Sequence, residues 1–133
     1  MSTVVIIDDQ ATTLKLLTKI ISDINMAAKP VEVEAFLDER HALSWIKRQP
    51  VDLVMLDYRL PRLDGLKIIE LIRMMPQHET LPIVMITALD DREILYKALD
   101  AGATDFLSKP IDYRECQARC RNLLHMREQQ LQL

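Results

Sequence analysis

Short, continuously apolar runs alternate along the chain with longer amphipathic stretches. The apolar runs are rich in Val and Ile, which is typical of strands buried on both faces, and the longer stretches carry apolar residues at helical spacing. The predicted strands are Thr3–Asp8, Val31–Phe36, Asp52–Asp57, Pro82–Thr87 and Thr104–Ser108. The predicted helices are Ala11–Asn25, Glu39–Arg48, Leu66–Met75, Asp90–Asp100 and Asp112–Leu133.

This order of strand and helix, repeated five times, predicts an α/β fold in which helices cover both faces of a five-stranded parallel sheet. Right-handed crossovers restrict the topology to a doubly wound fold. We expect the flavodoxin-like (βα)5 form of this fold, with strand order 2-1-3-4-5. Val31–Phe36 alternates Val and Glu, so we expect it near the sheet edge. Pro76 is expected to close the third helix, and Gly102 to end the fourth in a left-handed conformation.

Length and composition narrow the class of protein. The 133 residues suffice for one domain, and 49% hydrophobic with 28% charged residues is typical of a globular protein. The net charge of -3 argues against direct binding of nucleic acid, and the apolar runs are too short to span a membrane. The first residues lack the basic region of a signal peptide, so a cytoplasmic protein is expected. Cys116 and Cys120, four apart in a helical pattern, favour two packed thiols over a disulfide or a metal site.

Polar residues stand where four of the predicted strands end. Asp8 and Asp9 end the first strand, Asp57 the third and Thr87 the fourth, and Lys109 follows the fifth. Ligands of an open α/β sheet bind outside the carboxyl ends of its strands, so these side chains are expected to converge in one cleft. Each alone has an ordinary explanation, such as a helix cap for Asp, strand propensity for Thr or a surface turn for Lys-Pro. Their conjunction at one edge indicates a site.

The expected cluster suits phosphoryl chemistry. Three neighbouring carboxylates repel one another unless a cation intervenes, and ligands that are all oxygen favour Mg²⁺. Lys109 can then pair with a phosphoryl group as a point charge, and Thr87 can donate its hydroxyl. Asp57, at the centre, can attack phosphorus and hold an acyl phosphate, a transfer that depends mainly on positioning and charge neutralisation.

These residues resemble a known family. The motifs that carry the resemblance are Asp8-Asp9, Asp57, Thr87-Ala88, Lys109-Pro110, the loop Asp57–Gly65 and the segment Ala101–Phe106. Together they are similar to the receiver domains of bacterial two-component response regulators, over roughly residues 3 to 125. The resemblance implies a receiver domain at residues 1–125. Residues 126–133 are then an extension of the last helix and the start of a linker to a missing output domain.

The resemblance also implies roles for single residues. Asp57 would accept a phosphoryl group from a sensor histidine kinase or a phosphotransfer protein. Asp9 and Asp57 would hold Mg²⁺ directly, Asp8 mainly through water, and the main-chain carbonyl of Arg59 would be a further ligand. Thr87 and Lys109 would bind phosphoryl oxygens, and the Lys109–Pro110 bond would be cis.

A switch is implied as well. Thr87 would move toward the phosphoryl group and Phe106 would rotate into the vacated space, remodelling the face made by the fourth helix, fifth strand and fifth helix. The alternative for Phe106 is a plain core residue. Such a receiver catalyses only its own phosphorylation and dephosphorylation, so the enzymatic status of a full-length protein stays open.

Three kinds of partner follow. In receivers the histidine-bearing domain docks over the first helix and the loop after the fifth strand, here Gln10, Ala11, Leu14 and Pro110-Ile111, although Leu14 is equally well explained as core. A homodimer would use the switching face or the last helix. The last helix carries an imperfect heptad-like stripe, which Arg127 interrupts and which could form a dimer seam. The alternative is that the end of this helix is a frayed tail. The stripe is Tyr113, Cys116, Cys120, Leu123/Leu124 and Leu131.

The third partner is an output domain in cis. The run from 121 to 130 resembles linkers of regulators with cyclic-di-GMP (HD-GYP) phosphodiesterase outputs.

Three rival interpretations remain open to experiment. A nucleotide- or flavin-binding module needs a glycine-rich loop after the first strand, but the chain has only Gly65 and Gly102. An aspartyl phosphatase typically has a second Asp two residues after the nucleophile, where this chain has Arg59. A structural adaptor that has lost phosphorylation would not need to retain the whole polar set.

Overall fold

The computed structural model describes residues 2–25, 30–88 and 92–132. The strands are β1 (Ser2–Ile7), β2 (Val31–Phe36), β3 (Leu53–Asp57), β4 (Ile83–Thr87) and β5 (Asp105–Ser108). The helices are α1 (Ala11–Ser22), α2 (Glu39–Arg48), α3 (Gly65–Arg73), α4 (Arg92–Ala101) and α5 (Tyr113–Gln132), with a 3-10 turn, η1 (Pro76–His78). Every predicted strand and helix is present; β2 and α2 have the predicted bounds, and the other described ends differ by at most three residues. The predicted helix start at Asp90 and the predicted end at Leu133 lie outside the described residues.

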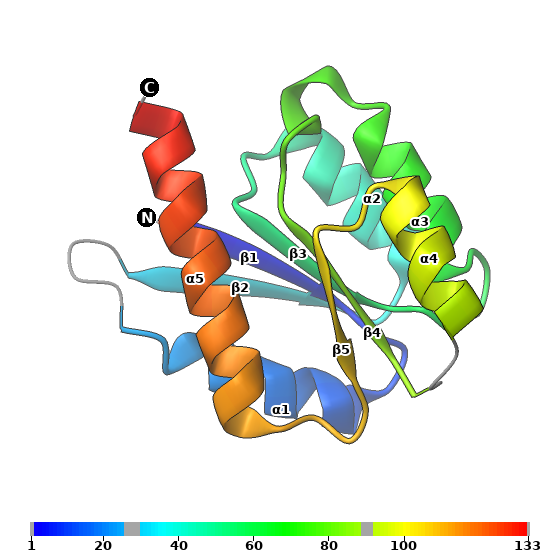
Figure 1. The fold of residues 1–133 in the computed structure, drawn as a ribbon, viewed down its shortest axis with the longest axis horizontal. Helices are drawn as coiled ribbons and strands as arrows, with labels where there is room; N and C mark the ends of the chain where they lie inside the picture. Colours follow the sequence, from blue (N-terminus) through cyan, green and yellow to red (C-terminus); the bar gives the residue numbers. More distant parts are fainter. Residues whose placement is uncertain (1, 26–29, 89–91, 133) are drawn as a thin grey trace.

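The five strands form one parallel sheet in the order β2-β1-β3-β4-β5, which confirms the predicted topology (Figure 1). β2 lies at one edge, as its alternating Val and Glu residues predict. β1 and β3 are inner strands, so their backbone groups pair on both sides and their side chains are covered on both faces.

Two layers of helices enclose the sheet (Figure 1). α1 and α5 cover one face, where Leu17 and Leu124 pack against Val4 and Met55. α2, α3 and α4 cover the other, where a second cluster includes Ile69. Successive residues of the inner strands belong to opposite clusters, and this explains why these strands have no polar face.

Local residues fix several helix ends. Asp38, Asp64 and Asp112 precede α2, α3 and α5, and each carboxylate accepts a backbone N–H of the first turn at 2.8–2.9 Å. Gly102 follows α4 with φ +113°, which confirms the predicted left-handed end. The prediction for Pro76 needs correction. α3 ends at Arg73, and Pro76 opens η1, since the first position of a helical turn needs no N–H donor.

The middle of the apolar stripe of α5 packs into its own domain, whereas its end members Tyr113 and Leu131 are exposed. Cys116, Cys120, Leu123 and Leu124 are all buried in the cluster beneath α1 and α5, and both thiols are free, as predicted. A dimer seam on this helix would therefore have to use other side chains. Within the described residues, every helix is too short or too polar to span a bilayer.

Arg127, which interrupts the stripe, does not face solvent, because its side chain is only 10% exposed. Its guanidinium lies 3.9 Å from the carboxylate of Asp52 and donates to the Thr80 hydroxyl at 3.2 Å. α5 therefore stays packed on the domain past residue 125, where the sequence placed the start of the extension.

Candidate functional site

The carboxyl ends of four strands bring the predicted polar residues to one edge of the sheet. Ile7 pairs with Leu56, and Asp57 pairs with Ile86, so Asp8 and Asp57 stand at the ends of neighbouring strands. Thr87 pairs with Ser108, the residue before Lys109. Side chains from positions 8 to 109 thus meet because parallel strands all end at the same edge.

Three carboxylates form the centre of this edge. One oxygen each from Asp8, Asp9 and Asp57 lies within 4.8 Å of the other two. Asp8 and Asp57 are 0% and 7% exposed, whereas Asp9 is exposed to solvent. The cluster is therefore closed on the sheet side and open on the side of Asp9, which leaves room for water among the ligands of a cation.

Lys109 supplies the positive charge of the cluster. Its Nζ donates to Asp57 Oδ2 at 3.0 Å and lies 3.7 Å from Asp8 Oδ2. Burial by itself lowers the pKa of Lys109, but the hydrogen bond to Asp57 and the charges of Asp57 and Asp8 outweigh it, so the pKa is raised. Lys109 is therefore held as a cation beside Asp57.

Asp8 is fully buried, and only one of its two carboxylate oxygens accepts a hydrogen bond from the described residues. Its Oδ1 accepts the backbone N–H of Gln10 at 2.9 Å, but its buried Oδ2 accepts no hydrogen bond. Burial raises the pKa of Asp8, and the neighbouring charges of Asp57 and Asp9 raise it further against the opposing effects of Gln10 and Lys109. A buried oxygen without a donor, in a set of oxygen ligands, fits a hard divalent cation.

The turn after β3 holds Asp57 in place. Asp57 Oδ1 accepts the backbone N–H of Arg59 at 3.3 Å, and the Gly65 N–H donates to the Tyr58 carbonyl at 2.8 Å. A Cβ on residue 65 would lie 2.9 Å from the Tyr58 Cα and 3.0 Å from the Asp57 carbonyl oxygen. Glycine is therefore required there, because the backbone of this loop passes directly against the end of β3.

Thr87 and Phe106 lie on the neighbouring strands. Thr87 is 1% exposed at the end of β4, and its carbonyl accepts the backbone N–H of Lys109 at 2.9 Å. Phe106 is half-buried on β5, where it pairs with Met85. The Lys109–Pro110 bond is cis, as the resemblance implied.

The residues predicted to contact a histidine-bearing partner have mixed exposure. Gln10, Ala11 and Pro110 are exposed, but Leu14 packs in the core at 7% exposure, so the core alternative holds for it. Leu16 is an exposed large apolar side chain on α1, at 46%.

One charged residue next to the loop that follows Asp57 was not predicted from the sequence. Glu39, the first residue of α2, is completely buried and contacts Arg62 of that loop. The apolar pattern of Glu39–Arg48 indicates burial for Ala42, Leu43, Trp45 and Ile46, and it carries no signal for a buried charge.

A family model described as response regulator receiver domain matches residues 4–121. The chain belongs to this family. Over 126 residues it is 45% identical to the cyclic di-GMP phosphodiesterase response regulator RpfG of Xanthomonas campestris pv. campestris, covering 95% of this chain and 32% of RpfG. This receiver domain therefore spans about a third of the length of that relative.

Solved structures agree with the fold. A response regulator from Chloroflexus aurantiacus matches with a TM-score of 0.84 at 31% identity, over 93% of this chain and 98% of that one. The receiver domain of the sensor histidine kinase PA1611 from Pseudomonas aeruginosa, described with magnesium coordinated in its active-site cleft, matches with a TM-score of 0.81 at 23% identity. That match covers 93% of this chain and 98% of the other.

Proposed function

We propose that this receiver domain accepts a phosphoryl group on Asp57, in a Mg²⁺-dependent reaction, from a sensor histidine kinase or a phosphotransfer protein. One observation carries the proposal. The oxygens of Asp8, Asp9 and Asp57 lie within 4.8 Å of one another, and Lys109 Nζ donates to Asp57 at 3.0 Å. This arrangement would supply a nucleophile, a cation site and a fixed positive charge.

In this proposal the ion is held by Asp9, Asp57 and the main-chain carbonyl of Arg59, with Asp8 acting mainly through water. Mg²⁺ would supply neutralising charge for the carboxylates and the incoming phosphoryl group. The magnesium described in the PA1611 receiver, which has the same fold, supports the assignment. The unpartnered Asp8 Oδ2 supports it from within this chain.

The reaction would form a bond from an Asp57 carboxylate oxygen to phosphorus and break the bond from phosphorus to the donor histidine nitrogen. Lys109, held as a cation beside Asp57, would stabilise the transferred oxygens, and the Thr87 hydroxyl would donate to one of them. The side chain two positions after Asp57 is the exposed Arg59, which cannot serve as a general base. The acyl phosphate is therefore expected to hydrolyse slowly, which favours a switch over a phosphatase with turnover.

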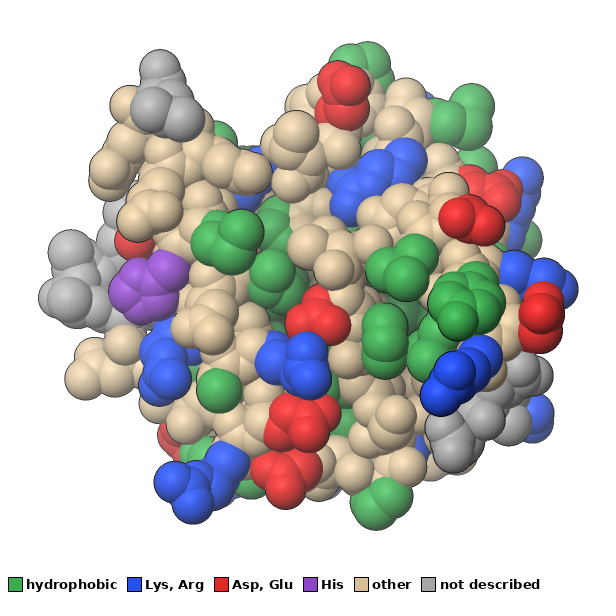
Figure 2. Space-filling view, in the orientation of Figure 1, with side chains coloured by type: hydrophobic (Ala, Val, Ile, Leu, Met, Phe, Trp, Pro, Cys, Tyr) green, Lys and Arg blue, Asp and Glu red, His purple; other side chains and the backbone are tan. Residues whose placement is uncertain are grey.

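The switch would operate on the face formed by α4, β5 and α5. Of the described residues of α4 only Ala98 is buried, so few apolar contacts oppose a shift of this helix. Figure 2 shows hydrophobic side chains gathered over α4, where Tyr96 and Leu99 are 57% and 46% exposed. We propose that movement of Thr87 and rotation of Phe106 change this surface, which would bind a partner or a second copy of the chain.

Beryllofluoride with Mg²⁺ tests the switch. We expect the amide signals of Thr87 and of residues 92–109 to shift on addition of both. A spectrum unchanged in that stretch would exclude this switching face and leave the fold untouched.

The output is proposed from the similarity to RpfG. We infer that the full-length protein carries a cyclic-di-GMP phosphodiesterase (HD-GYP) domain in cis, after a linker that begins within residues 126–133. The receiver would act in the cytoplasm through protein partners, without binding nucleic acid or membrane itself.

Incubation with acetyl phosphate and Mg²⁺, followed by intact mass measurement, tests the phosphorylation. We expect one added phosphoryl group that is lost in Asp57→Asn and slowed in Lys109→Ala. The absence of any adduct on the wild-type chain would favour a structural adaptor instead.

A further inference from the structure

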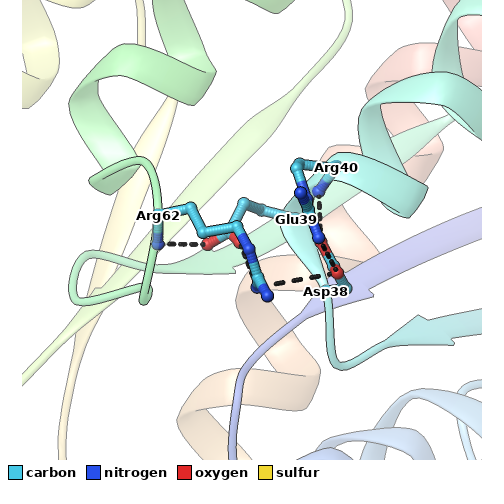
Figure 3. A network of polar contacts seen from close by, with 4 residues as sticks. All are labelled: Asp38, Glu39, Arg40 and Arg62. Carbon is cyan, nitrogen blue, oxygen red and sulfur yellow. Dashed lines mark hydrogen bonds and ion pairs between the residues drawn. The ribbon is translucent and has the colours of Figure 1, made fainter.

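A charged contact joins the start of α2 to the loop between β3 and α3 (Figure 3). Glu39 Oε2 accepts the backbone N–H of Arg62 at 3.4 Å, and Glu39 Oε1 lies 3.6 Å from Arg62 Nη1. The same Nη1 lies 3.6 Å from Asp38 Oδ2. Two consecutive residues of the chain at the start of α2 thus hold one residue of the loop that follows Asp57.

The complete burial of Glu39 makes this contact energetically important. Its side chain is 0% exposed, and Oε1 accepts no hydrogen bond. A carboxylate removed from water is costly unless a cation and hydrogen bonds compensate it. Here both the compensating N–H and the compensating guanidinium belong to Arg62, so the state of Glu39 depends on where the loop lies.

Among the described residues, this contact holds the middle of the loop, whereas two other hydrogen bonds hold its ends. The bond from Arg59 N–H to Asp57 and the bond from Gly65 N–H to Tyr58 close the two ends of the loop. Leu60 and Leu63 pack against the core cluster beneath α2 and α3, a non-directional contact. Glu39 adds a directional bond at Arg62, three residues after the proposed Mg²⁺ ligand Arg59.

We propose that Glu39 is a positioning residue for the phosphorylation site, which holds Arg62 and thereby fixes the loop whose Arg59 carbonyl would bind Mg²⁺. This inference rests on the proposed function, because it assigns Glu39 a role toward the ion of that site. Partners that orient metal ligands without touching the metal change its affinity by about 10- to 100-fold when they are removed.

The test is Mg²⁺ affinity measured by calorimetry on the folded chain without a phosphodonor. Glu39→Ala removes both contacts and should weaken Mg²⁺ binding about tenfold. Arg62→Ala removes the ion pair but keeps the backbone N–H, so its loss should be in the same direction and smaller. The double variant should lose no more than Glu39→Ala, because the two residues act as a unit.

Arg48→Ala is the matched control. Arg48 is an exposed arginine at the other end of α2, and its side chain donates to the Ser44 carbonyl of the same helix at 3.1 Å. Its removal should leave Mg²⁺ affinity unchanged. A phosphorylation assay adds a second readout, since raising Mg²⁺ to saturation should restore the rate of Glu39→Ala with acetyl phosphate.

Two results would overturn the inference. The first is a Glu39→Ala variant that loses stability but binds Mg²⁺ like the wild type, which would make Glu39 merely structural. The second is an unchanged affinity in Arg62→Ala, a test that remains if Glu39→Ala does not fold. Failure of the wild type itself to bind Mg²⁺ would instead refute the proposed function.

Discussion

Burial separates the three carboxylates of the site at the scale of single residues. Asp9 is open to water, whereas Asp8 is fully buried with one oxygen that accepts no hydrogen bond. Asp57 is also nearly buried, but Lys109 and the Arg59 N–H bind its two oxygens. Without a cation, the negative charges of the three carboxylates therefore repel one another, chiefly at Asp8. A bound divalent ion would relieve this repulsion.

Asp8→Asn should stabilise the domain when Mg²⁺ is absent. The substitution removes a buried charge and keeps the oxygen that accepts the Gln10 N–H, so the free energy of unfolding should rise by about 1 kcal/mol. Urea unfolding with EDTA measures this change. Added Mg²⁺ should then stabilise the wild type more than the variant. A variant less stable than the wild type in EDTA would contradict the account.

Asp38 should contribute pH-dependent stability. The hydrogen bonds from the side chain and backbone of Arg40 lower its pKa from 3.8 to about 2. Because the folded-state pKa is the lower one, the contribution is fully present above about pH 4 and is lost as the pH falls through about 2. Asp38→Asn should therefore destabilise the domain at pH 6 and have little effect near pH 2. A difference independent of pH would exclude this linkage.

Helices and strands were predictable where the apolar pattern and a local cap agree. Asp112 caps α5 as its position indicated. α1 was predicted to run to Asn25 because Ile24 continues the apolar spacing, but the helix ends at Ser22 and Ile24 packs in the core from outside it. The inward orientation of the Arg127 side chain was not predictable from the sequence. Its partners Asp52 and Thr80 lie far away along the chain.

Arg127→Ala tests how α5 is held at its far end. The variant loses buried stem packing and the bond to Thr80, so we expect a loss of about 1–2 kcal/mol in the free energy of unfolding. Arg121→Ala, which changes an exposed residue of the same helix, should be close to neutral. Equal stabilities of the two variants in chemical denaturation would show that Arg127 does not anchor the helix.

The whole molecule explains why the site was accessible from sequence. A parallel sheet places the carboxyl ends of all its strands at the same edge. Asp8, Asp57, Thr87 and Lys109 could therefore be grouped before any distance was known. The contact of Glu39 with Arg62 could not, since it depends on the path of one loop relative to a neighbouring helix. The topology of the sheet thus determines which residues form the site. The conformation of the loop after Asp57 would adjust their positions.

The most direct measurement is to locate the acyl phosphate itself. Borohydride reduces a phosphorylated aspartate to homoserine, which peptide mass spectrometry can place in the sequence. After incubation with acetyl phosphate, we predict homoserine at position 57, in the presence of Mg²⁺ and not with EDTA. Homoserine at position 8 or 9, or at none of the three, would contradict the account.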